Sequence, residues 1–337
     1  MTDLLKLVDE ILVHHPRFHE ATERIEQCFA FAHGRTEPVC LAIIGEARTG
    51  KSRALEACCQ QHPSARLDDG NCVPILSVKV PAKPTVKGLV EVMLEAVQDP
   101  RPQHGTESER TRRLRILMKG AQTRMIMIDE FQHFFDKGTR LIQHHVTDWL
   151  KTLVDDVKCA LVVAGLPSSH IVIGQNEQLA GRFLAPIQLS RFGWRTAVER
   201  AEFRAVLRGF YENLHPHLDV PEFHTEPMAF RLFWATGGLV GYLAKLIRQT
   251  VCNAISKKTK SINLEQLALA FKQCMWHEPG IDTLPNPFAK DADLEVTSDR
   301  LDQIERIGTV ASPSPVSKRR TSGRGSITSA NSCFVTK

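Results

Sequence analysis

Short, continuous apolar runs alternate with longer amphipathic stretches over residues 36–192. Apolar runs of this kind are typical of strands that are covered on both faces of a sheet. The predicted strands are residues 39–44, 74–80, 124–130 and 159–167. Helical spacing fills the stretches between them, and Thr85 is placed to cap the helix that runs through GLVEVMLEAV. This alternation predicts an α/β core, with a parallel sheet joined by crossover helices.

Helical patterns without strands dominate the rest of the chain. Residues 1–35 contain LLKLVDEIL and an amphipathic run from Pro16 to Ala32, which predict an N-terminal helical segment. Residues 99–110 resemble a polar linker before a short basic helix, TRRLRILMKG. Four helical segments over residues 193–284 predict a small all-α domain. Residues 285–337 turn rich in Ser, Gly, Pro and Arg, and we expect a basic, disordered tail there.

Charge and cysteine usage narrow the class of protein. The net charge is +5, but the six Lys and Arg from Arg306 onward face no acid, so residues 1–305 carry 5 − 6 = −1. A folded part that binds nucleic acid must therefore use a local basic patch. The nine cysteines form no C-x-x-C pair, which fits a reducing cytoplasm. We expect no secretory signal and no membrane span, since no apolar stretch reaches roughly 20 residues.

Residues 45–52, GEARTGKS, fit the pattern G-x-x-x-x-G-K-[ST] between a predicted strand and a predicted helix. Backbone N–H groups in such a loop curl around a phosphate chain at a helix N-terminus. The loop residues that could do so are Gly45, Glu46, Ala47, Arg48, Thr49 and Gly50. Lys51 would reach the β- and γ-phosphates of ATP, and the Ser52 hydroxyl would bind Mg²⁺. A chance glycine-rich turn is the alternative, which the strand–loop–helix context disfavours.

Two acids, Asp129 and Glu130, end the apolar strand RMIMIDE. A buried acid is costly unless it is paired or near a metal, and in P-loop enzymes such an Asp holds magnesium. A Glu beside it can orient or deprotonate the attacking water. We expect the two acids on a strand that neighbours the P-loop strand. Gln132 and His133 follow, and a helix start with local packing or hydrogen bonding is favoured for them over a role in sensing phosphate.

Three further groups of basic residues are candidates for contacts. Arg182 follows the fourth strand, at the position where ring-forming ATPases place an arginine that reaches a neighbouring protomer's nucleotide. A surface arginine is the alternative. Lys79, Lys83 and Lys87, with Thr85 among them, could contact DNA phosphates without sequence preference. A solvated basic loop is the alternative there, and Arg112, Arg113 and Arg115 are a weaker version of the same idea.

The motifs together resemble one family. GEARTGKS, VPILSVKVPAKPT, MIMIDEFQHF, LVVAGLP, QLAGRF and ATGGLVGYLAKLI occur in the order seen in the TniB/TnsC group of AAA+ ATPases. This group comprises accessory proteins of bacterial DNA transposition, related in role to MuB. The resemblance spans residues 10–290. It implies an AAA+ fold, ATP and Mg²⁺ as cofactors, slow ATP hydrolysis, a bacterial cytoplasmic protein, and rings or filaments on double-stranded DNA that present target DNA to a DDE-type transposase.

Carried over by position, the resemblance gives roles to individual residues. Lys51 and Ser52 are the P-loop contacts, Asp129 and Glu130 the Walker B pair, and Arg182 the arginine finger. The helical lid matches residues 196–276, with the turn at residues 236–238 near the nucleotide. Two sensor positions depart from the family pattern. Only Ser168 and Ser169 lie near the end of the fourth strand, and Gly241 stands where an arginine is expected, which leaves Lys245 or Arg248.

Two other functions fit the same motifs. One is a signalling or scaffold switch ATPase whose partner is a protein. The other is a helicase loader or secretion ATPase. The basic stretch around Lys83 is the feature that discriminates a DNA-bound protein from the first, through loss of duplex binding when Lys83 and Lys87 are replaced by Glu. A preference for single strands and binding to a hexameric helicase would indicate a loader.

Overall fold

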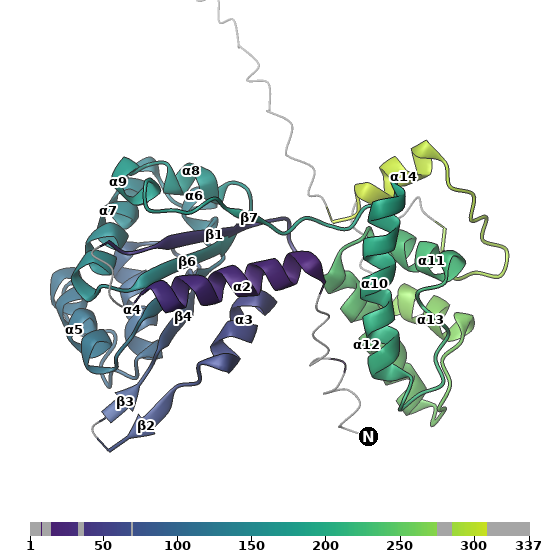
Figure 1. The fold of residues 1–337 in the computed structure, drawn as a ribbon, viewed down its shortest axis with the longest axis horizontal. Coiled ribbons are helices and arrows are strands. Elements are labelled where there is room, and N and C mark those ends of the chain that lie inside the picture. Colours follow the sequence, from purple (N-terminus) through teal and green to yellow (C-terminus); the bar gives the residue numbers. More distant parts are fainter. Residues whose placement is uncertain (1–7, 9–14, 33–36, 69, 275–284, 309–337) are drawn as a thin grey trace, which may run out of the picture.

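The computed structural model describes residue 8 and residues 15–32, 37–68, 70–274 and 285–308. Figure 1 shows an α/β lobe and a helical lobe, joined by the extended chain that follows β7. The elements of the α/β lobe are α2 (Pro16–Phe31), β1 (Cys40–Ile44), α3 (Lys51–Gln61), β2 (Ala65–Leu67), β3 (Gly70–Cys72), β4 (Ile75–Lys79), α4 (Val86–Ala96), α5 (Glu107–Gly120), β5 (Met125–Asp129), α6 (His133–Asp136), α7 (Arg140–Val157), β6 (Ala160–Gly165), α8 (Ser169–Ile173), α9 (Glu177–Ala180) and β7 (Ile187–Gln188). The helical lobe consists of α10 (Ala197–Leu214), α11 (Glu226–Thr236), α12 (Val240–Ser256), α13 (Leu264–Cys274) and α14 (Ser298–Glu305).

The main sheet is parallel throughout, with the strand order β4-β5-β6-β1-β7. Along β1 and β6 the register runs from Cys40 opposite Leu161 to Ile44 opposite Gly165. Strand β5, which ends in Asp129, pairs with the other side of β6. The expectation that the strand of Asp129 neighbours the P-loop strand is therefore wrong, because β6 lies between them. The two sites still meet, since the carboxyl ends of parallel strands share one edge of the sheet.

Successive residues of β1, β5 and β6 enter two separate cores, which explains why these runs are apolar, whereas the edge strand β4 exposes Ser77 and Lys79. On β1, Leu41 and Ile43 face the core formed with α2 and α3, and Ala42 and Ile44 face the core formed with α4, α5 and α7. Side chains alternate between the faces of a strand, so both faces of each strand must be apolar when helices cover both. The result is a three-layer α/β/α arrangement that fixes the edge where the P-loop lies.

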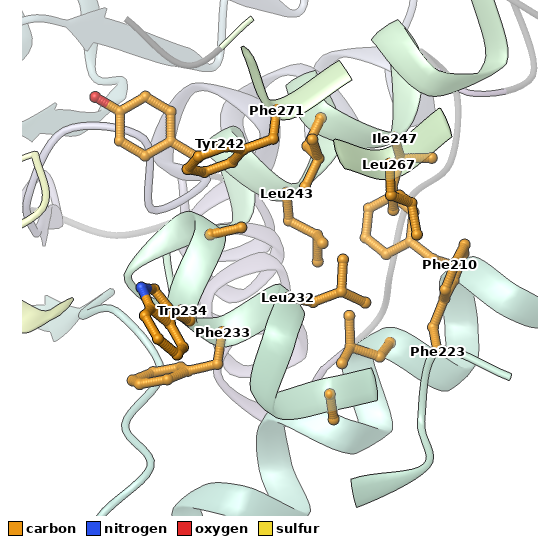
Figure 2. Close-up of a cluster of buried hydrophobic side chains, with 14 of the residues drawn as sticks. Phe210, Phe223, Leu232, Phe233, Trp234, Tyr242, Leu243, Ile247, Leu267 and Phe271 are labelled. Atoms are coloured by element: carbon orange, nitrogen blue, oxygen red, sulfur yellow. The ribbon is translucent and has the colours of Figure 1, made fainter. Parts of the chain in front are cut away.

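The helical lobe has its own core, built from aromatic and aliphatic side chains. Figure 2 shows side chains from α10, α11, α12 and α13 converging on one another. The labelled members are Phe210, Phe223, Leu232, Phe233, Trp234, Tyr242, Leu243, Ile247, Leu267 and Phe271. Trp194, in the chain that links the lobes, stacks against Phe233 with ring centroids 5.4 Å apart. The linker is thus packed into the core of the helical lobe, which is the expected lid. This packing fixes the lid relative to the chain that leaves β7.

The expected tail over residues 285–337 is wrong for its first part. Residues 298–305 form α14, whose N-cap Thr297 accepts a hydrogen bond from the backbone N–H of Arg300. Phe288, Leu301 and Ile304 are buried in the core of the helical lobe. A few apolar residues at helical spacing thus find a partner surface within a polar stretch, which composition alone does not register. Residues 309–337 lie outside the described residues.

Three short strands, β2, β3 and β7, were not predicted from the sequence, and one predicted helix begins earlier than expected. The hairpin of β2 and β3 is short and its first strand is exposed, so it has no apolar run to reveal it. Strand β7 has only two residues. Helix α5 starts at Glu107, within the stretch expected to be linker, because Thr106 and Glu109 form a reciprocal capping box. The expected first helix, LLKLVDEIL, lies outside the described residues except for Val8. Within the described residues, no helix is long and apolar enough to cross a membrane.

Candidate nucleotide site

The P-loop leaves the carboxyl end of β1 and leads directly into α3. Gly45 must be glycine, because an added Cβ would lie 2.0 Å from the carbonyl oxygen of Leu189. Gly50 caps α3 with a left-handed backbone (φ +100°), which glycine adopts at little cost. Thr49 Oγ1 donates to the carbonyl oxygen of Glu46 at 2.9 Å and closes the loop on itself. The sequence expectation of a strand, a glycine loop and a helix matches this arrangement.

Lys51 and Ser52 are the first residues of α3, and their polar atoms lie at the carboxyl edge of the sheet. Lys51 Nζ donates to the carbonyl oxygens of Gly45 (2.9 Å) and Glu46 (2.5 Å) within the loop. Burial lowers the pKa of Lys51, while the charges of Glu130, Asp129 and Glu46 oppose that shift. An ammonium held by loop carbonyls and nearby carboxylates is suited to meet an incoming polyphosphate, whose negative charge would favour its protonated form.

Ser52 and Asp129 meet across the sheet edge, although 77 positions of sequence separate them. Ser52 Oγ donates to Asp129 Oδ2 at 2.6 Å, and Asp129 Oδ1 accepts from the N–H of Glu130 at 2.8 Å. The Asp129 side chain is buried. A hydroxyl and a carboxylate are hard oxygen donors, the kind that Mg²⁺ prefers. The residues present therefore fit a magnesium–nucleotide site.

Glu130 is held by the residue two positions along, in a way the sequence did not reveal. Gln132 Nε2 donates to Glu130 Oε2 at 2.5 Å, while Gln132 Oε1 accepts from the N–H of Leu166 at 3.1 Å. The Gln132 side chain is buried, and Glu130 has a left-handed backbone (φ 59°), which is uncommon for a non-glycine residue. Gln132 therefore links the carboxylate expected to direct water to the end of β6. His133 lies further away, 3.9 Å from the same carboxylate oxygen.

The end of β6 offers a serine rather than a longer polar side chain. Ser169 is fully buried at the start of α8, and its Oγ has no hydrogen-bond partner among the described residues. A Cβ added to Gly165 would lie 2.2 Å from this oxygen, so Ser169 packs directly against the strand end. Ser168, the residue before it, is partly exposed. Of the two sensor candidates at this end of β6, only Ser169 is held inside the fold.

The lid is connected to the P-loop by an arginine that the sequence pattern did not single out. Arg191, which follows β7, donates from Nε to Glu46 Oε2 at 2.9 Å and from Nη1 to the Gly237 carbonyl at 3.3 Å. A second bond joins Arg191 Nη2 to the same Glu46 oxygen. The turn at residues 236–238 thus lies one arginine away from the P-loop. No local pattern marks an arginine at a hinge, so only the fold shows its role.

A second contact joins the start of α12 to the P-loop. The N–H of Gly241 donates to the Arg48 carbonyl at 2.9 Å, and a Cβ on Gly241 would lie 2.8 Å from the Arg48 Cβ. The Arg48 guanidinium lies over the Tyr242 ring, 4.7 Å from its centroid. Gly241 thus permits a close approach where an arginine was expected. Lys245 lies one turn further along α12, near Cys274.

Arg182 lies at the opposite edge of the sheet from the P-loop. Its carbonyl accepts from the N–H of Cys40, the first residue of β1, at 3.0 Å. The five residues of β1 span about 16 Å. Its guanidinium binds Asp155 of α7 through Nη1 and Nη2, the latter at 3.0 Å, and its side chain is 16% exposed. Within one protomer, Arg182 and the P-loop are not brought together.

The basic residues proposed for DNA lie at the carboxyl edge of the sheet. Lys79, opposite Asp129 in the β4–β5 register, is exposed, as are Lys83 and Lys87. The hydroxyl of Thr85 accepts from the Gly88 N–H at 3.0 Å and caps α4. The three lysines therefore form an exposed basic edge, which we call the lysine edge, while Thr85 has a structural partner.

The second basic group is largely used within the fold. Arg113 Nε donates to Asp99 Oδ2 at 2.6 Å and Arg113 Nη2 donates to two backbone carbonyls. Arg115 pairs with Asp156 at 3.0 Å. Arg112 is exposed. Two of the three arginines thus have acidic partners, which makes this helix a weaker candidate for DNA contact than the lysine edge.

Comparisons with known proteins agree with this geometry. Among solved structures, the chain is similar to Aeropyrum pernix ORC1 in complex with DNA (TM-score 0.56, 17% identity, 80% of this chain and 69% of that one). It is also similar to Cdc6p from Pyrobaculum aerophilum (TM-score 0.60, 12% identity, 83% and 74%). Domain III of the replication initiation protein DnaA from Thermotoga maritima follows (TM-score 0.50, 16% identity, 80% and 96%). At these identities the likeness concerns the fold.

The expected fold class is confirmed: the chain has the fold of AAA+ P-loop ATPases, with a parallel sheet followed by a helical lid. No curated protein matches the sequence. The family model described as bacterial TniB protein matches residues 4–194, which span the α/β lobe, the P-loop and the hinge arginine. This match covers more than half of the chain and agrees with the resemblance carried by the motifs. The chain belongs to the TniB family of bacterial proteins.

Proposed function

We propose that this protein is an ATP-dependent, DNA-binding oligomer that regulates transposition by presenting target DNA to a DDE-type transposase. The observation that carries the proposal is the meeting of Ser52 and Asp129, 2.6 Å apart, beside the P-loop of a TniB-family chain. This constellation supports binding of ATP with Mg²⁺. The bacterial cytoplasm is the proposed location of the protein. Family membership supports transposition over a signalling switch or a helicase loader.

The residues at the site have separate tasks in slow ATP hydrolysis. The P-loop amides and Lys51 bind the phosphates, and Ser52 with Asp129 would hold the magnesium. Magnesium, when bound, neutralises phosphate charge. Glu130 orients the attacking water and accepts its proton, and Gln132 fixes the carboxylate that does so. Arg191 and Gly241 hold the lid against the loop, so nucleotide binding and lid position are coupled.

Oligomer formation is proposed from the position of Arg182. This side chain lies at the far edge of its own sheet, so the nucleotide it could serve belongs to another protomer. To do so, its guanidinium must exchange Asp155 for a phosphate. An arginine supplied in trans stabilises charge on the transferring phosphoryl group. ATP at the interface would then assemble the oligomer, and hydrolysis would dismantle it.

DNA contact is proposed for the lysine edge, Lys79, Lys83 and Lys87. One of the similar structures is that of ORC1 in complex with DNA, which supports DNA as the partner of this fold. Phosphate contacts of this type give affinity without sequence preference and weaken with salt. Thr85 remains a proposed neighbour of the phosphates, since its backbone lies among the lysines.

The test combines electron microscopy with DNA-binding titrations on the full chain. With duplex DNA and a slowly hydrolysed ATP analogue, we expect regular particles that coat the DNA, and none without nucleotide. Lys51→Ala should abolish nucleotide binding and assembly. Lys83→Glu with Lys87→Glu should weaken duplex binding at least tenfold and leave nucleotide binding unchanged. Lys119→Glu, an exposed lysine at the end of α5, is the matched control.

Each alternative function has a distinct outcome in the same experiment. Unaltered DNA affinity in the double lysine variant removes the lysine edge from the proposal. Nucleotide binding without any DNA affinity indicates a switch with a protein partner. A preference for single strands together with binding to a hexameric helicase indicates a loader. Monomers under every condition contradict the oligomeric mechanism.

A further inference from the structure

Away from the nucleotide, three metal-ligating side chains meet between α2 and α3. We propose that Glu26, Cys58 and His62 form a Zn²⁺ site that fastens the N-terminal helix to the helix of the P-loop. Within the described residues, this is the group of His, Cys, Asp and Glu side chains whose ligand atoms converge, all lying within 4.8 Å of one another. None of the three belongs to the nucleotide site.

The spacing of the residues explains why they converge. Cys58 lies in the last turns of α3 and His62 follows four residues later at its C-cap, so both project from one face of the helix. Glu26 projects from α2, which packs against α3. Cys58 Sγ lies 2.8 Å from Glu26 Oε1, and His62 Nε2 lies 2.7 Å from Glu26 Oε2. Two helices thus supply one sulfur, one nitrogen and one carboxylate.

The donor set suits zinc in number, type and charge. Zinc bonds of about 2.0–2.3 Å in a tetrahedron place ligand atoms about 3.4 Å apart. The two separations from Glu26 need to open by less than about 1 Å to reach that value, and Cys58 and His62 have their ligand atoms within 4.8 Å of each other. A thiolate and a carboxylate balance the two positive charges, and the imidazole stays neutral. Sulfur and imidazole favour zinc over magnesium, which selects oxygen ligands.

Three protein ligands leave the fourth tetrahedral position of zinc open, and the exposure of the cluster indicates what could fill it. Cys58 is fully buried, whereas the Glu26 and His62 side chains are 30% and 27% exposed. The fourth position therefore faces solvent and suits a water molecule. The His62 ring is held by stacking on Phe29, with centroids 3.9 Å apart, and the Arg124 guanidinium lies 4.2 Å from the centroid of that Phe29 ring. An oriented imidazole reduces the entropy lost on metal binding.

Without metal, Cys58 and His62 are hydrogen-bonded to Glu26. Burial raises the pKa of the Cys58 thiol well above its ordinary value, and the hydrogen bond and charge of Glu26 raise it further. The thiol then donates to Glu26. Zinc would take the place of the thiol proton between Cys58 and Glu26. Cys58 lies about 10 Å along α3 from Lys51, so the metal would hold the P-loop helix in place without touching nucleotide.

The test uses Co²⁺ as a spectroscopic substitute for Zn²⁺ on the full, chelator-treated chain. We expect one Co²⁺ per chain, a thiolate-to-cobalt charge-transfer band, and loss of that band when one equivalent of Zn²⁺ is added. Cys58→Ser should remove the band, and Cys59→Ser should keep it. Cys59 is the matched control, since it is the adjacent cysteine and its Sγ lies 3.9 Å from Met127 Sδ, outside the cluster.

A second readout covers the case in which Cys58→Ser does not fold. His62→Gln replaces a partly exposed side chain, and it should weaken Co²⁺ binding at least tenfold while the sulfur band remains. Zn²⁺ should raise the melting temperature of the wild type but not that of His62→Gln. A wild-type protein without the charge-transfer band, or an unchanged band in Cys58→Ser, overturns the proposal and leaves a hydrogen-bonded triad.

Discussion

Replacing Gln132 with alanine tests whether this residue positions the carboxylate of Glu130. Gln132 donates to Glu130 at 2.5 Å and accepts from the N–H of Leu166 at 3.1 Å, so alanine removes both bonds at once. A hydrogen bond to a charged group contributes about 1.5–3 kcal/mol. If that bond is kept in the transition state, its loss lowers kcat about ten- to hundredfold, at about 1.4 kcal/mol per factor of ten.

The size of the loss in kcat distinguishes a residue that positions Glu130 from a residue that acts as the general base. Removing a general base costs about 10²–10⁴-fold, so Glu130→Ala should lower kcat more than Gln132→Ala. The stranded N–H of Leu166 costs a further ~1–3 kcal/mol of stability if it stays buried. Nucleotide affinity should change little, because the hydrogen bonds of the Gln132 side chain go to Glu130 and Leu166 and not to the residues proposed to bind the phosphates. The signature is thus a kcat loss with an unchanged dissociation constant for ATP.

The assay is single-turnover ATP hydrolysis beside titration with a fluorescent nucleotide. Gln143→Ala is the matched control, since Gln143 is another buried glutamine, on α7, whose Nε2 donates to the Gly138 carbonyl at 3.4 Å. A kcat for Gln132→Ala within twofold of the wild type would refute the reasoning. An equal loss in Gln143→Ala would assign the effect to general loosening of the lobe.

Three further substitutions test other contacts. Ile304→Ala, at a fully buried position of α14, should lower the free energy of unfolding by about 2–5 kcal/mol in urea titrations, whereas Val296→Ala, at a half-exposed position, should change it by less than about 0.5 kcal/mol. Arg191→Ala should speed hydrogen exchange in the turn at residues 237–241, and Arg195→Ala, whose partners lie on α14, should not. Burial raises the pKa of Asp155, but the hydrogen bond and charge of Arg182 outweigh it and hold the pKa below its ordinary value. The pair therefore stabilises the fold above the unfolded pKa of about 3.9, and the difference in stability between the wild type and Asp155→Asn should narrow as pH falls below that value.

The parts predicted well are those in which one local pattern determines one structure. The conformation of the loop at residues 45–52 follows from its own sequence. Gly45 leaves room for the Leu189 carbonyl oxygen, and Gly50 adopts a left-handed backbone that side chains disfavour. The strands in residues 39–44, 124–130 and 159–167 are apolar on both faces because helices cover both faces of the sheet, whereas the edge strand in residues 74–80 exposes Ser77 and Lys79. Such runs can be recognised as strands without knowing which strands they pair with. The order of the strands in the sheet depends on that pairing, and the sequence analysis wrongly placed β5 beside β1.

The parts missed are those in which a short or polar segment gains its structure from a distant surface. Helix α14 has only eight residues, and its buried positions Leu301 and Ile304 depend on the core of the helical lobe. Glu26 and Cys58 are 32 positions apart and meet only because α2 packs on α3. Gln132 follows a common motif, yet its task depends on the end of β6, a strand from elsewhere in the chain. Sequence spacing alone does not encode these distances.

The contacts between P-loop and lid suggest why the variable positions of this P-loop are not free to vary. The pattern G-x-x-x-x-G-K-[ST] leaves Glu46 and Arg48 unspecified, but in this chain the Glu46 carboxylate binds Arg191 and the Arg48 guanidinium lies over the Tyr242 ring. A loop that reorganises around a triphosphate must therefore move both lid contacts together. The lid, in turn, is tied through Trp194 and the linker to β7. We therefore expect nucleotide state and lid position to change together, through the variable residues of the motif that contact the lid.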